Sequence, residues 1–330
     1  GYKADEIFKN TKQIQIVACG SSYNAGLVAK YWIEDIAKIP CSIEVASEYR
    51  YRRPIILDNT LFVTISQSGE TADTIEALQA AKKINTTIKS LCICNSNESS
   101  LTRLSDLTFL THAGPEIGVA STKAFTTQLV ALALFLCSVG KLQNNINKQQ
   151  EKDIVNGLKK LPGLINEALL QENQIKRLSA RFKNKNSALF LGRGTMHAIA
   201  TEGALKLKEI SYIHAEAYPA GELKHGPIAL IDKDMPVIAI APNDDLLEKL
   251  KSNLQEVKSR GSEMIVFEDQ NSKISSMNAL EVIPITSNLG RITAPIIFTI
   301  PLQLLSYHVA LSRETNVDKP RNLAKSVTVE

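Results

Sequence analysis

The feature that most constrains the fold is a repeated alternation between short β-branched segments and longer segments of helical period. In the longer segments, apolar residues recur at three- and four-residue steps, as at Ala72, Ile75, Leu78 and Ala81, so each helix presents one stripe to a sheet. Strands that are apolar on both faces and alternate with helices form parallel sheets with crossover helices. The pattern predicts an α/β fold, with strands in the first half at 15–18, 42–46, 61–65, 90–93 and 107–110.

The same alternation resumes after residue 186, in a chain whose 330 residues are about twice the length of a typical domain. The two halves also match in detail, because Glu44 follows Gly20 by 24 residues and Glu216 follows Gly192 by the same 24. We therefore predict an internal duplication. The expected second-half strands lie near 188–191, 236–241, 264–267 and 281–285, and the expected helices near 197–213, 245–260 and 293–311.

The stretch between the halves, residues 141–186, is rich in Asn, Gln and Lys and contains helical segments around Pro162 and Gly163. Such a stretch is typical of a connection between domains, and its surplus of Lys and Arg is interpreted as solvated helix faces. After Pro320 the chain cannot continue a helix, so by itself it would be a frayed tail. The predicted first domain, helical connection, second domain and tail are 1–150, 151–186, 187–317 and 318–330.

Composition excludes several classes of protein. A formal net charge of +4 is too small to indicate a nucleic-acid partner. The longest apolar run, 129–139, is shorter than the ~18–20 residues that cross a bilayer, so no membrane span is expected. Five cysteines without paired spacing, and histidines without ligand spacing, predict reduced core residues of a cytoplasmic protein and no metal site. The chain begins without Met or an apolar leader, so we expect a fragment rather than a natural start or a signal peptide.

The sharpest motif is Ser66-Gln67-Ser68-Gly69-Glu70-Thr71, directly after the strand 61–65 and directly before the helix from Ala72. Backbone amides at a helix N-terminus attract anions, and the three hydroxyls add donors without adding charge. The motif lacks the Lys-Ser or Lys-Thr pair of a nucleotide-binding P-loop. It therefore favours a small phosphorylated metabolite. The alternative is a capped helix, with Ser66 or Ser68 as the N-cap.

Two further polar loops follow expected strands, one at 20–24 and one at 118–123. Ligands of open parallel sheets bind outside the carboxyl ends of the strands, so these loops point to the same edge as the phosphate motif. For Ser121 and Thr122, a simple helix cap is the competing interpretation.

In the second half, Glu202, Lys206 and Glu209 fall at i, i+4 and i+7, hence on one face of the predicted helix. A solvated Glu–Lys pair is the ordinary interpretation. The alternative is a general base, because Glu209 lies near the negative end of its helix, where protonation of a carboxylate is favoured. The Gly- and Pro-rich segment 218–227 is expected to be a loop, and its His225 is a candidate functional group.

The combined motifs closely resemble the isomerase half of the bacterial glucosamine-6-phosphate synthase family, also called glutamine:fructose-6-phosphate amidotransferases. The resemblance extends over essentially the whole chain and is carried by 19–24, 66–71, 118–125, 202–216, 221–227 and 322–330. It implies tandem SIS domains, that is, two flavodoxin-like three-layer αβα sandwiches with parallel sheets, and a homodimer.

The resemblance also assigns site residues. It implies that the sugar phosphate is held by Ser66, Gln67, Ser68 and Thr71, and that the sugar is lined by Ser22, Val119, Ala120, Ser121 and Ala324. It makes Glu209 the base that moves a proton between C1 and C2, and His225 the group that helps open the sugar ring. Lys325 is implied to form an imine with the open ketone, with Lys206 and Glu202 as polar neighbours.

The implied reaction converts fructose 6-phosphate and ammonia to glucosamine 6-phosphate without a metal or other cofactor. The family's full chain begins with a glutaminase domain that supplies ammonia, and this sequence contains nothing like it. We therefore expect use of free ammonia only, and slow isomerisation to glucose 6-phosphate without it. The alternatives are a plain phosphosugar isomerase and a non-catalytic regulatory module that binds sugar phosphates.

Overall fold

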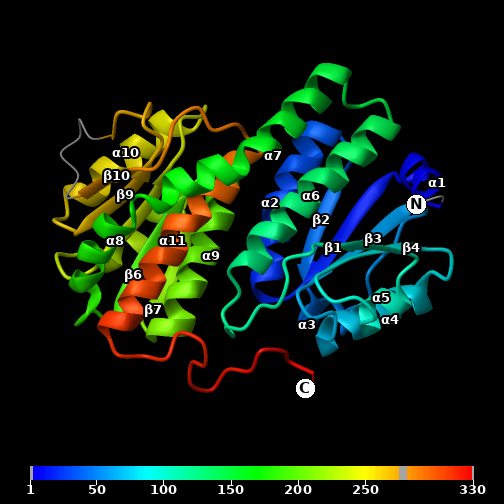
Figure 1. The fold of residues 1–330 in the computed structure, drawn as a ribbon, viewed down its shortest axis with the longest axis horizontal. Helices are drawn as coiled ribbons and strands as arrows, with labels where there is room; N and C mark the ends of the chain where they lie inside the picture. The colour runs from blue at the N-terminus through cyan, green and yellow to red at the C-terminus, as the bar shows by residue number, and fades with distance from the viewer. Residues whose placement is uncertain (1–2, 275–280, 329–330) are drawn as a thin grey trace. The chain divides into compact units, whose positions relative to one another are not determined.

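The computed structural model describes residues 3–274 and 281–328, which form two compact units (Figure 1). Unit 1 comprises Gly1–Asn156 with Ala324–Glu330, and unit 2 comprises Gly157–Leu323. The last residues of the chain therefore belong to the unit that contains its beginning. The four segment boundaries expected from the sequence stay a prediction. Gly1, Tyr2, Val329 and Glu330, which the first and last of those segments include, lie outside the described residues.

Unit 1 is built on a parallel sheet with the strand order β2-β1-β3-β4-β5. One face is covered by α2 and α6, because a Cβ on Gly26 of α2 would touch Ile16, Ile43 and Ile65 of the sheet. The other face is covered by α3, α4 and α5, whose Tyr49, Leu78 and Leu101 share an apolar cluster with strand residues. The strands are β1 (Gln13–Ala18), β2 (Cys41–Val45), β3 (Thr60–Ser66), β4 (Lys89–Cys94) and β5 (Leu107–Leu110). The helices are α1 (Ala4–Asn10), α2 (Gly20–Trp32), the π-helical turn η1 (Ile33–Ala37), α3 (Ala46–Tyr49), α4 (Ala72–Ile84), α5 (Ser100–Leu104) and α6 (Lys123–Leu142).

Unit 2 has a parallel sheet with the order β10-β9-β8-β6-β7. Helix α9 packs closely against α11 and the sheet, since a Cβ on Gly203 would meet Leu302 at 2.7 Å and Phe190 at 3.1 Å. Helix α10 packs on the opposite face, where Leu250 and Leu254 join an apolar cluster with β6, β8 and β9. The strands are β6 (Ser187–Gly192), β7 (His214–Pro219), β8 (Val237–Ala241), β9 (Met264–Glu268) and β10 (Glu281–Pro284). The helices are α8 (Glu172–Ser179), the 3-10 turns η2 (Ala180–Phe182), η3 (Ala220–His225) and η4 (Pro227–Leu230), α9 (Thr195–Ser211), α10 (Leu247–Lys258) and α11 (Thr293–Ser312).

The two units repeat one topology. Numbered within its own unit, each sheet runs second, first, third, fourth, fifth, which is the flavodoxin-like order. The predicted fold class, two parallel αβα sandwiches, is confirmed, and the shared order agrees with the expected duplication. The helix α7 (Lys148–Leu169) runs from one unit into the other and continues through Pro162.

Several local expectations differ from the structure. The segment expected to be a loop at 20–24 is instead the start of α2. The strand β7 was not predicted, because it is an edge strand with mostly half-buried residues and no apolar run. The strand expected at 42–46 ends at Val45, and Ala46 begins α3. The segment expected to be a loop at 218–227 is instead the end of β7 followed by the 3-10 turns η3 and η4.

Two helices, α6 and α11, are long and apolar enough to cross a membrane by length and composition alone. Both are largely buried within the protein, where they cover their sheets. Burial in a protein core accounts for their composition. The five cysteines are unpaired, and all except the partly exposed Cys19 are buried.

Candidate functional site

The strand order of unit 1 creates a switch point between β1 and β3. The chain leaves β1 into α2 on one face and leaves β3 into α4 on the other face (Figure 1). In such sheets the ligand crevice lies outside the carboxyl ends of the two strands at this point. The segment 20–24, predicted to be a loop, is the start of α2 directly after β1, and the loop 66–71 follows β3. The topology therefore places both segments at one edge of the sheet.

The loop 66–71 is tightly folded around Gly69. The Gly69 amide donates to Ser66 Oγ at 2.9 Å, and the Glu70 amide donates to Ser68 Oγ at 3.1 Å. Gly69 has a φ of +70°, and a Cβ at this position would collide with the Ser99 side chain and approach Cys94 Sγ to 2.8 Å. Only glycine therefore fits here. Ser66 is buried and its Oγ lies 3.4 Å from Thr71 Oγ1.

The helix that follows this loop is not capped as the alternative interpretation requires. Its N-cap is Thr71 rather than Ser66 or Ser68, and Thr71 makes no side-chain cap hydrogen bond. The first amide of the helix, at Ala72, donates instead to the Val327 carbonyl at 3.0 Å. Gln67, half-buried, accepts the Asn95 amide through its backbone carbonyl at 3.3 Å. The loop thus presents hydroxyls and a helix N-terminus to the crevice.

Two carboxylates near the loop have partners of their own. Glu70 accepts the Ser100 amide at 2.7 Å, and hydrogen bonds to the Ser100 side chain and amide lower the pKa of this carboxyl. Asp73, in the first turn of α4, is paired with Arg50 at 2.8 Å.

The last residues of the chain lie on the same loops. Ser326 Oγ lies 3.1 Å from Ser68 Oγ, and Lys325 Nζ donates to the Gly118 carbonyl at 2.7 Å. The predicted Ala324 is exposed, and Ala120 is buried while Val119 and Ser121 are half-buried. A segment that alone would be a frayed tail is thus held between the loop 66–71 and the loop that contains Gly118.

Thr122 is the N-cap residue of α6, as the competing interpretation allowed, but its side chain makes no cap hydrogen bond. The Glu116 carboxylate takes that place, because it accepts the amides of Thr122 at 3.2 Å and Ala124 at 2.8 Å. Sequence reasoning missed Glu116, although an acidic residue shortly before a helix start was the available signal. A carboxylate at this helix end opposes an anion.

Ser22, in the first turn of α2, is buried and accepts a hydrogen bond from Gln128 Nε2 of α6 at 3.0 Å. Sequence reasoning missed Gln128 as well. The available signal was a polar residue among the apolar residues of α6, where Gln128 is one of the buried side chains.

The predicted residues of unit 2 form a buried ionic cluster on α9. Lys206 Nζ lies 2.5 Å from Glu209 Oε2 and 3.6 Å from Glu202 Oε1. The side chains of Lys206, Glu202 and Glu209 are 3%, 1% and 21% exposed, so the interpretation as a solvated pair is wrong. Burial lowers the pKa of Lys206, but the two carboxylates outweigh it and the pKa is raised overall. Lys206 is therefore an ammonium ion that is paired with Glu209 near the end of the helix.

His225 ends the turn η3 and is exposed. Within the described ranges, no hydrogen bond or ion pair connects it with the cluster on α9. Its neighbour Lys224 pairs with Glu256 of α10 at 3.0 Å. The candidate residues thus fall into two sets, one on each unit.

The loop of unit 2 that corresponds to 66–71 follows β8 and leads to α10. There Asp244 accepts the Leu246 amide at 2.9 Å, and burial raises the pKa of this carboxyl. A carboxylate at this position opposes an anion. The two matching loops therefore differ, with hydroxyl side chains in unit 1 and a carboxylate in unit 2.

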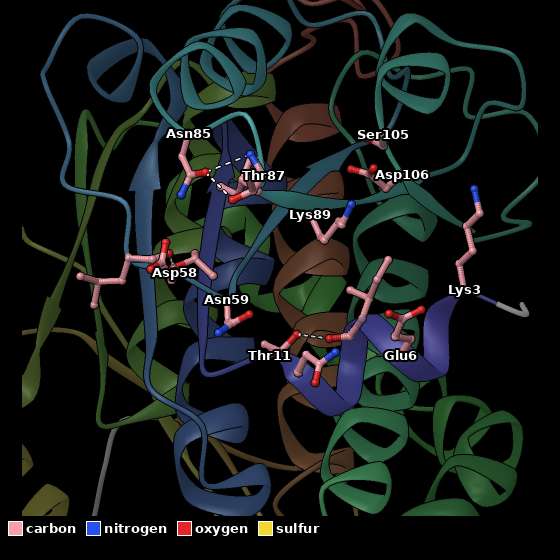
Figure 2. A pocket seen from close by; sticks show the side chains of 15 residues that line it. Lys3, Glu6, Thr11, Asp58, Asn59, Asn85, Thr87, Lys89, Ser105 and Asp106 are labelled. Carbon is pink, nitrogen blue, oxygen red and sulfur yellow. Dashed lines mark hydrogen bonds between the residues drawn. The ribbon is translucent and has the colours of Figure 1, made fainter.

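A pocket of about 910 Å³ opens at the opposite edge of the unit 1 sheet. Figure 2 shows Glu6 of α1 and the preceding Lys3 beside it, together with Lys89 and Asp106. Its strand residues Thr60 and Lys89 begin β3 and β4, whereas the loop 66–71 follows the end of β3. None of the predicted site residues lines this pocket. In residues 3–274 and 281–328, no group of three or more His, Cys, Asp or Glu side chains is arranged to hold a metal ion.

Comparison with known proteins identifies the family. The sequence profile of the SIS domain matches this chain twice, at residues 7–138 and 181–313. The chain belongs to the SIS domain family. The two matches fall on the two sheets, which supports the duplication, and the resemblance found in the sequence motifs is confirmed.

Relatives of this SIS protein carry one recurrent name. A glutamine–fructose-6-phosphate aminotransferase [isomerizing] of Pseudomonas aeruginosa is 57% identical over 330 residues, covering 100% of this chain and 54% of the relative. The chain thus spans about half the length of the curated relatives it matches. The C-terminal domain of glucosamine-fructose-6-phosphate aminotransferase from Francisella tularensis is 55% identical with a TM-score of 0.93, covering 97% of this chain and 90% of that one. A glucosamine-6-phosphate deaminase from Thermotoga maritima is 25% identical with a TM-score of 0.74, covering 98% of this chain and 95% of that one.

Proposed function

We propose that this chain is the sugar-converting half of an isomerizing aminotransferase. It binds fructose 6-phosphate, opens the ring and, with ammonia, converts it to glucosamine 6-phosphate. The names of the relatives and the 55% identity to a C-terminal aminotransferase domain support this proposal. The plain phosphosugar isomerase and the regulatory module are the alternatives that the experiment below separates.

The observation that carries the proposal is the buried cluster of Lys206, Glu202 and Glu209. Burying charged groups is costly, so a cluster with two carboxylates on one ammonium is unlike a stabilising surface pair. A half-buried carboxylate held by a protonated lysine suits proton transfer between adjacent carbons, because it can accept a proton and return it. A module that only binds its ligand has no use for this arrangement.

In the proposed reaction the loop 66–71 holds the phosphate through Ser66, Gln67, Ser68 and Thr71. Binding energy at the phosphate, remote from C1 and C2, fixes the orientation of the reacting carbons. Around the sugar we place Ser22, Val119, Ala120, Ser121 and Ala324.

The chemical steps fall to His225, Lys325 and Glu209. The imidazole of His225 exchanges protons with the ring oxygen and the anomeric hydroxyl as the ring opens. The Lys325 amine condenses with the C2 ketone and releases water, and ammonia then displaces the lysine to give the C2 imine. Glu209 removes a proton from C1 and delivers it to C2, while the proton of the C1 hydroxyl passes to the imine nitrogen, leaving an amine on C2 and an aldehyde at C1.

The proposal also covers the oligomeric state, the location, the source of ammonia and the role of the tail. We propose a cytoplasmic homodimer whose ammonia comes from a glutaminase domain elsewhere in a longer chain. The tail 318–330 contributes to the active site, an assignment supported by the contacts of Lys325 and Ser326 with the unit 1 loops. Glucose 6-phosphate is the expected product when ammonia is withheld.

Product analysis with and without ammonium chloride tests the proposed function. We expect fructose 6-phosphate to yield glucosamine 6-phosphate only with ammonium, and glucose 6-phosphate slowly without it. Sugar isomerisation without any amino sugar would identify a plain isomerase, and binding without turnover would identify a regulatory module. Glu76→Gln, a change to an exposed carboxylate of α4, serves as the matched control for Glu209→Gln.

A further inference from the structure

The polar pair formed by Gln128 and Ser22 lies in the core between α2 and α6 of unit 1. Gln128 is 2% exposed and Ser22 is 9% exposed. Gln128 Nε2 donates to Ser22 Oγ at 3.0 Å. Most neighbours of Gln128 on α6 are apolar, including Phe125 and Leu129. A carboxamide at this depth therefore calls for an explanation other than solvation.

The second polar atom of the same side chain shows that the pair is not built for stability. Gln128 Oε1 is buried and accepts no hydrogen bond from the described residues. Nearly all buried acceptors in native proteins have a donor, and one without a donor destabilises the fold. A methionine or leucine would fill the same space without this cost. The carboxamide is thus retained for the bond that it makes to Ser22.

That bond determines which way the Ser22 hydroxyl can act. A serine oxygen can accept two hydrogen bonds but has a single proton to donate. Because Gln128 Nε2 occupies one acceptor position, the Ser22 proton must point elsewhere. Among residues 3–274 and 281–328, Ser22 makes no second side-chain hydrogen bond. Its proton is therefore available to a ligand at the switch point, where α2 begins after β1.

We propose that Gln128 is a positioning residue for sugar recognition, which fixes the Ser22 hydroxyl as a donor to an oxygen of the bound sugar. This inference rests on the proposed function and deepens it, since it concerns the sugar rather than the phosphate. The phosphate loop 66–71 follows a different strand, and its hydroxyls have no bond to Gln128. The two parts of the ligand are thus recognised by separable groups.

The test compares two probes, fructose 6-phosphate and inorganic phosphate, by calorimetric titration. Gln128→Met removes the donor and fills the space, so it should weaken fructose 6-phosphate binding about five- to tenfold and leave phosphate binding unchanged. Its melting temperature should equal or exceed that of the parent protein, because the unpartnered Oε1 is removed as well. Gln128→Leu also removes the donor and should show the same selective loss.

The chain offers a matched control in a second Gln–Ser pair of unit 1, in which the glutamine is buried and Ser42 is half-buried. Gln15 of β1 is 8% exposed and accepts from Ser42 Oγ of β2 at 2.5 Å. Gln15→Met should leave the affinity for fructose 6-phosphate unchanged. Combining Gln128→Met with Ser22→Ala should weaken binding no more than Ser22→Ala alone, since both changes remove one interaction.

The outcomes distinguish a failure of the positioning role of Gln128 from a failure of the proposed function. If the parent protein binds fructose 6-phosphate and Gln128→Met binds it equally well, the positioning role is overturned and the proposed function stands. Equal losses for both probes, or additive losses in the double variant, also overturn the positioning role, because they indicate a general packing defect. If the parent protein binds phosphate but no sugar phosphate, both the proposed function and this inference fail.

Discussion

Replacing Lys206 by methionine tests whether the cluster on α9 is a coupled buried unit. The ammonium lies 2.5 Å from Glu209 and 3.6 Å from Glu202, and neither Lys206 nor Glu202 has more than 3% of its side chain exposed. Removing one partner of a buried ion pair leaves uncompensated charge and costs about 3–5 kcal/mol. For a unit of this size, each kcal/mol lowers the melting temperature by about 2–4 °C, so we expect a fall of about 6–20 °C at pH 8.

The loss of stability in Lys206→Met should also depend on pH. In the parent protein the pKa of Lys206 is raised above its ordinary value of 10.5, so its stabilisation is fully present below that value. It is lost only as the pH rises through the higher folded pKa, and so stays constant between pH 5 and pH 8. In Lys206→Met, protons taken up by the carboxylates replace the missing charge. The deficit in unfolding free energy should therefore shrink as the pH falls from 8 to 5.

Calorimetric melting at pH 5, 6.5 and 8 measures both effects. Lys208→Met is the matched control, because Lys208 is exposed on the same helix and its loss should change stability by no more than about 0.5 kcal/mol. Adding Glu202→Gln to Lys206→Met should recover part of the loss at pH 8. A Lys206→Met protein that is as stable as Lys208→Met, or a deficit that does not vary with pH, would refute the reasoning.

Three further changes have specific expected results. Glu209→Gln should lower turnover by ~10²–10⁴, with a nearly unchanged KM for fructose 6-phosphate, and a variant that keeps full turnover in steady-state assays would remove Glu209 from the mechanism. Ser68→Ala should weaken phosphate binding about tenfold or more in calorimetric titration, since it removes a hydrogen bond to a charged group, and unchanged affinity would argue against the loop. Gly69→Ala should destabilise unit 1 by more than 1 kcal/mol in thermal unfolding, because of its φ of +70° and the collision with Ser99, and a neutral result would contradict the described loop geometry.

The fold could be predicted largely because most of its strands are apolar or β-branched segments that can be recognised in the sequence. Within residues 3–274 and 281–328, nine of the ten strands lie where apolar or β-branched segments predicted them, and the strand 107–110 has the bounds expected from the sequence. The tenth, β7, lies at a sheet edge where His214, Glu216 and Tyr218 face partly outward, so the apolar pattern is missing. The 3-10 turns that follow it depend on local packing, which Gly and Pro content does not distinguish from an irregular loop.

The candidate site was predictable only in part. Helical spacing placed Lys206 between Glu202 and Glu209, but it did not show that the cluster is buried, because burial depends on the packing of α9 against its unit. The loop 66–71 was found from its position between a strand and a helix. The contacts of Lys325 with Gly118, and of Gln128 with Ser22, join positions more than 100 residues apart, and no spacing rule connects them.

The most direct test of the account is a crystal structure of this chain with fructose 6-phosphate. We predict that the phosphate lies within hydrogen-bonding distance of Ser66, Ser68 and Thr71, at the carboxyl end of β3. A phosphate bound instead at the opposite edge of the sheet, beside Lys3 and Lys89, would contradict it.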